Sequence, residues 1–374
     1  MNGYAAISCP HDTILIMNLK IGIVGLPNAG KSTLFNALLK KQVAFAANYP
    51  FATIEPNIGV VPVPDERLAK LAAITLAEDH LETLPPLRPA TVEFVDIAGL
   101  VKGASVGEGL GNKFLAHIRE VNIICNVLRF FPDSNIIHTE GGIDAGRDRE
   151  IVETELVLAD LQTLGKQPEP KMNATKEDRA RYDLVQTLKV AMDSGKRARE
   201  VLTDPDDQEL VRPLQLLTMK PIVYVGNVSE AQLGTPPQTQ LSPIVYICAQ
   251  TESELAAMTP QEQKDYLASL GVTSSGLDLL IRTAYETLGL ISFLTTGELE
   301  SRAWTIECGM KAPTAAGVIH TDFEKKFIKA DVVSFDDFVS LGGWKKSREV
   351  GKVRSEGKEY EMQDGDVVEF KIGS

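Results

Sequence analysis

The sequence predicts an α/β protein in which a helical hairpin is inserted into a sheet domain and a smaller α+β domain follows. Three observations predict this architecture. Short apolar runs alternate with helical stretches, and this alternation breaks between about residues 149 and 213. From about residue 290 the pattern becomes one of short strand-like runs separated by turns. The length of 374 residues is enough for two or three domains, at about 100–200 residues each.

The sheet domain is predicted from the alternation of strands and helices. The apolar run Lys20–Gly25 ends in glycine, as a buried parallel strand does, and Thr33–Leu39 continues with helical spacing. Strands that alternate with helices indicate a parallel sheet covered on both faces. The further strand-like runs are Thr91–Ile97, Asn122–Leu128, Pro221–Val225 and Ile244–Ala249, and the further helical stretches are Lys113–Arg119 and Leu277–Leu288.

The inserted hairpin is predicted from two helical patterns around a turn. Apolar residues recur at helical spacing in 151–159 and again in 184–191. Gly165–Pro170 between them is a turn with two prolines, and Thr175–Asp178 resembles a capping sequence. These features favour an αα-hairpin that protrudes from the sheet.

The C-terminal domain is predicted from short strand-like runs separated by turns. The runs are Trp304–Ile306, Ile328–Val333 and Val367–Phe370, and Gln363–Asp366 is a turn signal. The expected division of the chain is therefore a disordered extension at 1–18, a discontinuous sheet domain at 19–148 and 214–289, the hairpin at 149–213 and the last domain at 290–374. Met1–Met17 has no Lys or Arg and so lacks the basic start of a signal peptide; an upstream start codon is the other explanation.

The net charge of −13 limits the partners that the chain can attract. An acidic protein does not attract nucleic acid or an anionic membrane through its overall field, so we expect no DNA partner. No apolar run approaches the roughly 18–20 residues of a membrane span, and none is predicted. One stretch of local charge +4 is a solvated loop face or an RNA-facing patch, and the sequence leaves both open. Its basic residues are Lys345, Lys346, Arg348, Lys352, Arg354 and Lys358.

The segment Gly25-Leu-Pro-Asn-Ala-Gly30-Lys31-Ser32 fits the phosphate-loop pattern G-x-x-x-x-G-K-[ST], with a strand before it and a helix after it. The glycines let backbone N–H groups wrap a phosphate, to which the helix N-terminus adds its positive end. Lys31 is expected to reach the β- and γ-phosphates and Ser32 to ligate Mg²⁺. An ordinary glycine-rich turn is the alternative. The predicted phosphate-binding residues are Asn28, Ala29, Gly30, Lys31, Ser32 and Thr33.

Two further segments point to a metal-assisted nucleotide site. Asp96-Ile-Ala-Gly99 closes a predicted strand, where such an Asp holds magnesium, often through water, and the glycine N–H meets the γ-phosphate. Thr53 lies in the loop after the first helix, where a threonine hydroxyl can ligate Mg²⁺. A lone threonine in such a loop is more often no ligand at all.

These motifs resemble the YchF/Obg-like ATPase family of Obg-related P-loop GTPases. The resemblance rests on the phosphate loop, on Asn48-Tyr-Pro-Phe-Ala-Thr-Ile-Glu-Pro-Asn57, on Phe94–Ser105 with Gly107–Asn112, and on Ala316–Lys325 with Gln363-Asp-Gly-Asp-Val. It covers nearly the whole chain from Leu19. It implies a P-loop G domain, a helical insert and a C-terminal TGS domain of the ubiquitin-like β-grasp type, together with ATP, Mg²⁺ and a ribosome or ribosomal RNA partner.

The base-recognition segment departs from that of most GTPases. They carry N-K-x-D after the strand that corresponds to Pro221–Val225, whereas this chain has Asn227-Val-Ser-Glu230. Glu230 is one methylene longer than Asp, and Val228 cannot reproduce the Lys. The change predicts a loss of guanine preference, and the resemblance implies ATP use, with Val228 presenting backbone and Asn227 a polar contact to adenine. A degenerate but guanine-selective loop is the alternative.

Hydrolysis is expected to be slow without help, because Leu100 stands where Ras-type enzymes carry a water-orienting Gln. His138 is the candidate to orient the water, His117 is its competitor, and either can equally be structural. The predicted function is a cytoplasmic Mg²⁺-dependent ATPase that uses GTP secondarily and acts as a ribosome-linked or stress-linked switch. The alternative is a GTP-preferring switch, or a ribosome-binding module with negligible hydrolysis.

Overall fold

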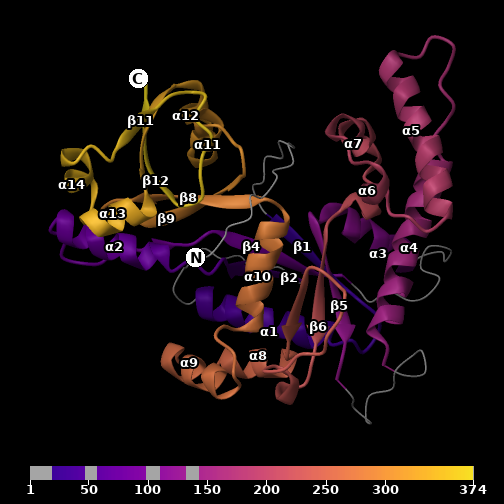
Figure 1. The fold of residues 1–374 in the computed structure, drawn as a ribbon, viewed down its shortest axis with the longest axis horizontal. Coiled ribbons are helices and arrows are strands. Elements are labelled where there is room, and N and C mark those ends of the chain that lie inside the picture. The colour runs from indigo at the N-terminus through magenta and orange to yellow at the C-terminus, as the bar shows by residue number, and fades with distance from the viewer. Residues whose placement is uncertain (1–18, 47–56, 98–109, 132–142, 374) are drawn as a thin grey trace. The chain divides into compact units, whose positions relative to one another are not determined.

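The computed structural model describes residues 19–46, 57–97, 110–131 and 143–373, which form two compact units (Figure 1). The first comprises 19–61 and 92–284 and is called the nucleotide unit below. The second comprises 62–91 and 285–373 and is called the C-terminal unit. None of the helices within the described ranges is both long and apolar enough to cross a membrane.

A six-stranded sheet forms the centre of the nucleotide unit, with strand order β2-β4-β1-β5-β6-β7. From β4 to β7 every neighbouring pair is parallel. The strands are β1 Leu19–Val24, β2 Ile58–Pro62, β4 Thr91–Asp96, β5 Ile123–Arg129, β6 Ile222–Asn227 and β7 Ile244–Ile247. All of β5 and β6 is buried, as expected for strands covered on both faces. The predicted parallel sheet is confirmed, and its parallel strands end at one edge.

Helices connect these strands in the pattern that the alternation predicts. The helix after β1 begins at the lysine of the phosphate loop, and the helix after β7 begins directly at the end of that strand. The helices of the unit outside the hairpin are α1 Lys31–Ala46, α3 Leu110–Glu120, α8 Ala249–Leu255, α9 Pro260–Ser269 and α10 Gly276–Thr287, with short 3-10 turns η2 Leu217–Met219 and η3 Glu230–Gln232.

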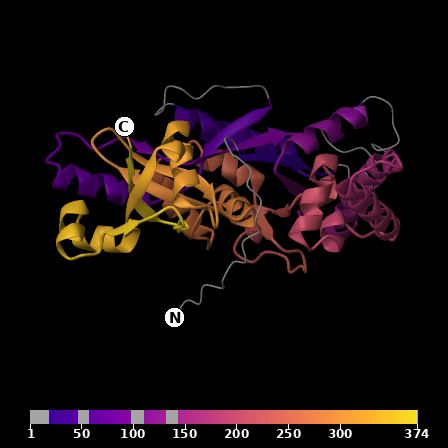
Figure 2. The same ribbon diagram turned by 90° about the horizontal axis from the view of Figure 1, so that it is seen from above.

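The hairpin consists of α4 Ala145–Gly165 and α5 Lys176–Asp193, which lie side by side in both views (Figures 1 and 2). Thr175 and Asp178 form the expected capping box at the start of α5. Two short helices, α6 Ala198–Val201 and α7 Pro205–Val211, complete it with η1 Arg212–Leu214. The hairpin has its own apolar core, which includes Leu164, Leu188 and Val211.

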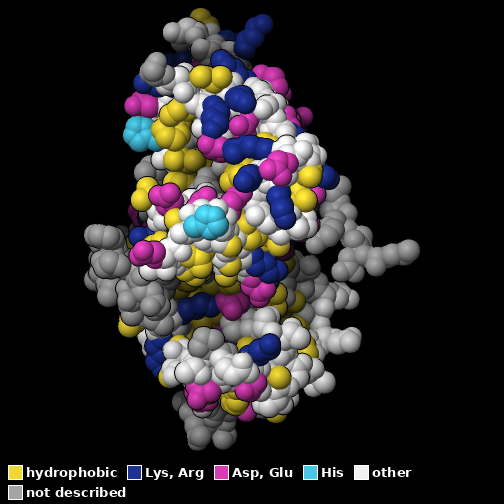
Figure 3. Space-filling model, turned by 90° about the vertical axis from the view of Figure 1, so that its left-hand side faces the viewer, with side chains coloured by type: hydrophobic (Ala, Val, Ile, Leu, Met, Phe, Trp, Pro, Cys, Tyr) yellow, Lys and Arg dark blue, Asp and Glu magenta, His cyan; other side chains and the backbone are white. Residues whose placement is uncertain are grey.

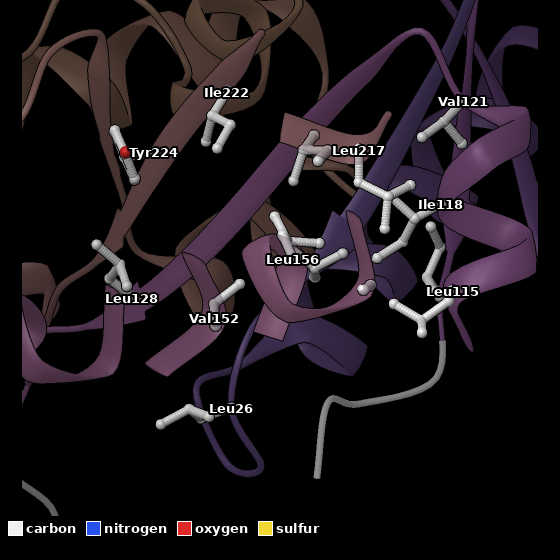
Figure 4. Close-up of a cluster of buried hydrophobic side chains, with 14 residues drawn as sticks. Leu26, Leu115, Ile118, Val121, Leu128, Val152, Leu156, Leu217, Ile222 and Tyr224 are labelled. Atoms are coloured by element: carbon white, nitrogen blue, oxygen red, sulfur yellow. The ribbon is translucent and has the colours of Figure 1, made fainter. Parts of the chain in front are cut away.

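Helix α4 also anchors the hairpin to the sheet. Val152 and Leu156 pack with residues of β5, β6 and α3 in a second buried cluster (Figure 4). Leu26 of the phosphate loop belongs to the same cluster. Asp160 of α4 is fully buried and accepts hydrogen bonds from the backbone N–H groups of Leu217 and Thr218, at 2.7 and 2.8 Å. The helix that starts the insert is thus part of the core under the phosphate loop.

The C-terminal unit contains a second, mixed sheet with strand order β11-β10-β12-β8-β9-β3. β8 and β9 are antiparallel, β10 pairs antiparallel with β12, and β12 pairs in parallel with β8 at the centre. This is the β-grasp arrangement expected of a TGS domain. Its elements are β8 Leu290–Thr296, β9 Ser301–Glu307, α11 Ala312–Ile319, α12 Thr321–Lys325, β10 Phe327–Ser334, α13 Phe335–Leu341, α14 Trp344–Glu349, β11 Arg354–Glu356 and β12 Asp366–Ile372.

Residues 62–91 differ from the sequence prediction, which includes them in the nucleotide-binding domain. They form α2 Arg67–Glu78 and β3 Leu87–Arg88, and β3 pairs with β9. The apolar stripe of α2, which includes Leu68 and Leu71, is buried in a cluster with residues of β8, β9, β10, α13 and β12. The helical stripe had to be buried against some sheet, and periodicity alone does not say which.

Glu78 at the end of α2 strengthens this association. Its carboxylate accepts hydrogen bonds from the backbone N–H groups of Trp344 and Lys345, at 3.0 and 2.6 Å, at the start of α14. A Cβ on Gly343 would come within 2.2 Å of the same carboxylate. The acidic side chain therefore satisfies two N–H groups that the helix itself leaves without partners.

Candidate nucleotide site

The predicted phosphate loop connects β1 to α1 in a conformation that requires glycine. Gly25 and Gly30 have φ of 148° and 100°, and Asn28 has φ of 63°. A Cβ on Gly25 would lie 2.5 Å from the Val127 carbonyl oxygen. Such conformations and close approaches are accessible to glycine and strained for other residues. The loop thus runs tightly against β5 before the helix begins.

Lys31 is buried at the start of α1, and its Nζ donates a hydrogen bond to the Leu26 carbonyl oxygen at 2.8 Å. Burial lowers the pKa of Lys31, and the nearby Asp96 carboxylate opposes this shift. Burial likewise raises the pKa of Asp96, and the positive charge of Lys31 opposes this rise. Asp96 ends β4 in register with Ile23 of β1, so the two motifs are adjacent through strand pairing.

A cavity of about 640 Å³ joins the phosphate loop to the predicted base-recognition segment. Its walls come from the phosphate loop, the ends of β5 and β6, and the start of α8. The lining residues are Asn28, Gly30, Lys31, Ser32, Thr33, Phe131, Asn227, Val228, Ser229, Glu230, Cys248, Ala249, Gln250 and Thr251. Every wall therefore lies at the carboxyl edge of the parallel sheet, where open α/β sheets bind their ligands.

Asn227 ties the two ends of this cavity together. Its Nδ2 donates to the Ala29 carbonyl oxygen at 3.0 Å, and its Oδ1 accepts from the Ala249 N–H at 3.3 Å. A Cβ on Gly30 would lie 2.0 Å from the same Nδ2. Both ends of the amide are engaged with protein backbone, so Asn227 acts first as a brace between the phosphate loop and α8.

Val228 and Glu230 differ in their exposure to solvent. Val228 is buried, and its N–H donates to the Ile247 carbonyl oxygen at 2.9 Å, so any backbone contact to a base would use its carbonyl. Glu230 is exposed, and its Oε2 accepts from Thr251 Oγ1 at 3.2 Å and from the Tyr266 hydroxyl at 2.8 Å. The hydrogen bond to Glu230 is the main cause of a raised pKa of Tyr266.

Two of the remaining predicted residues, Ala29 and Asp96, do not line the cavity. Ala29 is buried within the phosphate loop, and Asp96 ends β4. Thr53, Gly99, Leu100 and His138, together with residues 1–18, lie outside the described residues. His117 is exposed on α3.

Several cavity residues escaped the sequence prediction. Phe131 follows β5, and the buried Arg129 lies over its ring at 4.6 Å. Cys248–Thr251 follow β7, whose position at the carboxyl edge was a signal that sequence reasoning could have used. Tyr266 reaches Glu230 from α9, and no motif or spacing marks it.

Two family models match the chain. Residues 20–163 match the MMR_HSR1 family, described as "50S ribosome-binding GTPase". Residues 290–373 match the YchF-GTPase_C family, described as "Protein of unknown function". The second match coincides with the strands and helices of the C-terminal unit from β8 onward.

A curated relative covers both units. "Ribosome-binding ATPase YchF" of Bacillus subtilis (strain 168) is 46% identical over 372 residues, which are 95% of this chain and 100% of that protein. The chain belongs to the YchF family. YchF proteins of Haemophilus influenzae and Escherichia coli O157:H7 are 44% and 43% identical, each over 95% of this chain and 99% of their own length.

A solved YchF structure has the same fold. The "Structure of the Schizosaccharomyces pombe YchF GTPase" matches with a TM-score of 0.83 at 35% identity, over 98% of this chain and 100% of that one. The names of these YchF proteins differ in the nucleotide, since the bacterial ones are called ATPases and the yeast one a GTPase. The base end of the cavity is therefore the part of the site that matters most for the nucleotide of this chain.

Proposed function

We propose that this YchF protein is a Mg²⁺-dependent ATPase that uses GTP secondarily and acts in the cytoplasm as a ribosome-linked nucleotide switch. The observation that carries this proposal is the single cavity shared by the phosphate loop and the segment Asn227–Glu230. The names of the bacterial YchF relatives, "Ribosome-binding ATPase", support the nucleotide and the partner.

In this proposal the phosphate end binds the triphosphate through backbone N–H groups of Asn28–Thr33 and through the Lys31 ammonium. Donor chemistry fits Mg²⁺, because the Ser32 hydroxyl in the cavity and the Asp96 carboxylate near Lys31 are hard oxygen ligands. The bound ion would neutralise charge that develops on the phosphates. Thr53, Gly99 and His138 keep the roles that the sequence suggests, as a magnesium ligand, a γ-phosphate contact and a water-orienting residue.

The base end supports ATP over GTP. Val228 replaces the Lys that packs along guanine in N-K-x-D proteins, and Val228 is buried with its N–H engaged by Ile247. Glu230 replaces the Asp that accepts from guanine, and two protein hydroxyls bind one of its oxygens. Adenine lacks the 2-amino group that such an acid recognises, so it loses less from these changes than guanine does.

The test is calorimetric titration of the purified protein with ATP and with GTP in the presence of Mg²⁺. The proposal expects tighter binding of ATP, together with turnover of ATP to ADP. Tight GTP binding with no ATP binding would refute the base assignment. For the catalytic histidine, single-turnover hydrolysis should slow in His138→Ala, and an unchanged rate removes it from the mechanism.

Ribosome contact is proposed through the C-terminal unit and the hairpin. Fewer basic side chains are available for this contact than the sequence suggests, because several are paired with acids. Arg348 pairs with Glu369, Lys352 with Asp337 and Arg354 with Asp366, at 2.7, 3.2 and 3.8 Å. Counting these acids reduces the local charge from +4 to +1. Figure 3 looks onto the side that carries α13 and α14 and shows basic side chains interleaved with acidic ones.

In the hairpin, the positive charge of Arg197 is likewise balanced by acids, because Arg197 forms ion pairs with Glu200 and Glu153, at 2.6 and 3.6 Å. Lys345 and Lys346 on α14 are the better candidates, because neither has an ion pair within the described residues. Ribosome co-sedimentation should weaken with salt and with Lys345→Glu/Lys346→Glu. Binding that is indifferent to both would remove α14 from the contact.

A further inference from the structure

The side chain of Glu230 is held in place before any base arrives. Ser229 caps the turn η3, and its N–H and hydroxyl both donate to Gln232 Oε1 at 2.9 Å, which positions the backbone at Glu230. Thr251, which is fully buried at the start of α8, and Tyr266 of α9 then donate to the same oxygen, Oε2. Three separate segments therefore converge on one exposed carboxylate at the cavity wall.

The two hydroxyls limit what this carboxylate can accept. Each carboxylate oxygen has two lone-pair sites, and two donors already engage Oε2. Guanine presents two neighbouring donors, N1–H and the 2-amino group, which an acid in this position binds with both oxygens. A carboxylate that offers only Oε1 must accept both donors on one oxygen, in a three-centre contact that is weaker than one oxygen for each donor. Weakly paired donors in a binding site cost affinity, so guanine is penalised and adenine, which lacks both donors, is not.

We propose that Tyr266 is a specificity-determining positioning residue: with Thr251, it holds Glu230 by one oxygen and thereby withholds the second acceptor that guanine needs. The inference rests on the proposed function in one respect, namely that the base binds beside Glu230. Tyr266 does not line the cavity and acts only through the carboxylate. Tyr266→Phe removes this hydroxyl and keeps the ring.

The experiment compares binding of ADP and GDP by calorimetry, so that neither hydrolysis nor a γ-phosphate enters the result. Tyr266→Phe should lower the preference for ADP over GDP by about three- to tenfold, through tighter GDP binding and unchanged ADP binding. The matched control is Tyr182→Phe on α5, which also removes a hydroxyl that is hydrogen-bonded to a glutamate, Glu169. The control should leave both affinities unchanged.

Glu230→Ala and the double variant with Tyr266→Phe complete the test. Glu230→Ala should itself change the ADP-to-GDP ratio, and Tyr266→Phe should add nothing in that background, because the hydroxyl acts through the carboxylate. If Glu230→Ala changes the ratio and Tyr266→Phe does not, the role of Tyr266 is wrong and the base assignment stands. If neither changes it, the base does not bind beside Glu230 and both proposals fail. An effect of Tyr266→Phe that persists without Glu230 also overturns the inference.

Discussion

At the phosphate end of the cavity, Gly25–Gly30 and Lys31 follow one another along the chain, whereas the base end draws Asn227–Glu230, Cys248–Thr251 and Tyr266 from three separate segments. The phosphate end depends on backbone conformations that one short motif encodes. The base end depends on side chains that meet only when β6, β7 and α9 are in place. Phosphate chemistry is the same in every nucleotide, so a local motif suffices for it, while selectivity requires an assembled surface.

The largest expected effect is at the phosphate end, in Lys31→Ala. Loss of the ammonium should weaken ADP binding by about a thousandfold, because it removes charge-assisted hydrogen bonds to phosphate. Calorimetry measures the change. Lys40→Ala, at an exposed position on the same helix, is the control and should bind normally. A loss of less than tenfold would mean that backbone groups alone hold the phosphates.

Gly30→Ala tests the contact between the phosphate loop and Asn227 at the base end. Its Cβ would lie 2.0 Å from Asn227 Nδ2, at a φ of +100°. The free energy of unfolding should fall by about 2–4 kcal/mol, measured in urea. Gly195→Ala is matched in backbone strain, with φ of +85°, but has open space around the added Cβ. Equal losses in both variants would show that contact with Asn227 carries no cost.

Glu252 gives the base end a pH dependence. It is buried next to Thr251 and accepts a hydrogen bond from the Gly276 N–H at 2.6 Å, and burial raises its pKa to about 7. Between the unfolded pKa, about 4.3, and the folded one, the native state holds a proton that the unfolded state has lost, so stability falls as pH rises through this window. The penalty above it is about 4 kcal/mol at most.

Glu252→Gln should therefore be more stable than the wild type above pH 7 and should flatten the pH dependence between 5 and 7. Urea unfolding at a series of pH values measures both effects. Glu254→Gln, at an exposed position of α8, should retain the wild-type profile. A profile for Glu252→Gln that follows the wild type would assign the dependence to another group.

A smaller effect than those of Lys31, Gly30 and Glu252 is expected for Asn227→Ala, which tests whether Asn227 serves the phosphate loop or the base. The variant loses hydrogen bonds to Ala29 and Ala249. ADP and GDP should both bind about tenfold more weakly, because the brace contacts backbone and not the base. Asn173→Ala, at an exposed turn of the hairpin, is the control. A loss confined to one nucleotide would make Asn227 a reader of the base.

Much of the fold was predictable from periodicity. The strands of the parallel sheet, both hairpin helices and the capping box at Thr175 follow patterns that local sequence encodes. Residues 62–91 show the limit of such reasoning. The apolar stripe of α2 predicts a helix with one buried face. The sheet that buries this face comes from residues more than 200 positions later.

Among the site residues, the same physical difference separates what could be foreseen from what could not. The phosphate loop is predictable from a short stretch of residues, because its glycines and lysine act through local backbone geometry and through spacing to the next helix. The sequence also marked Asn227–Glu230 as unusual. In contrast, the brace of Asn227 on the loop and the hold of Thr251 and Tyr266 on Glu230 exist only in the folded chain. Hydrogen bonds between distant segments depend on how strands and helices pack, and no local pattern records that packing.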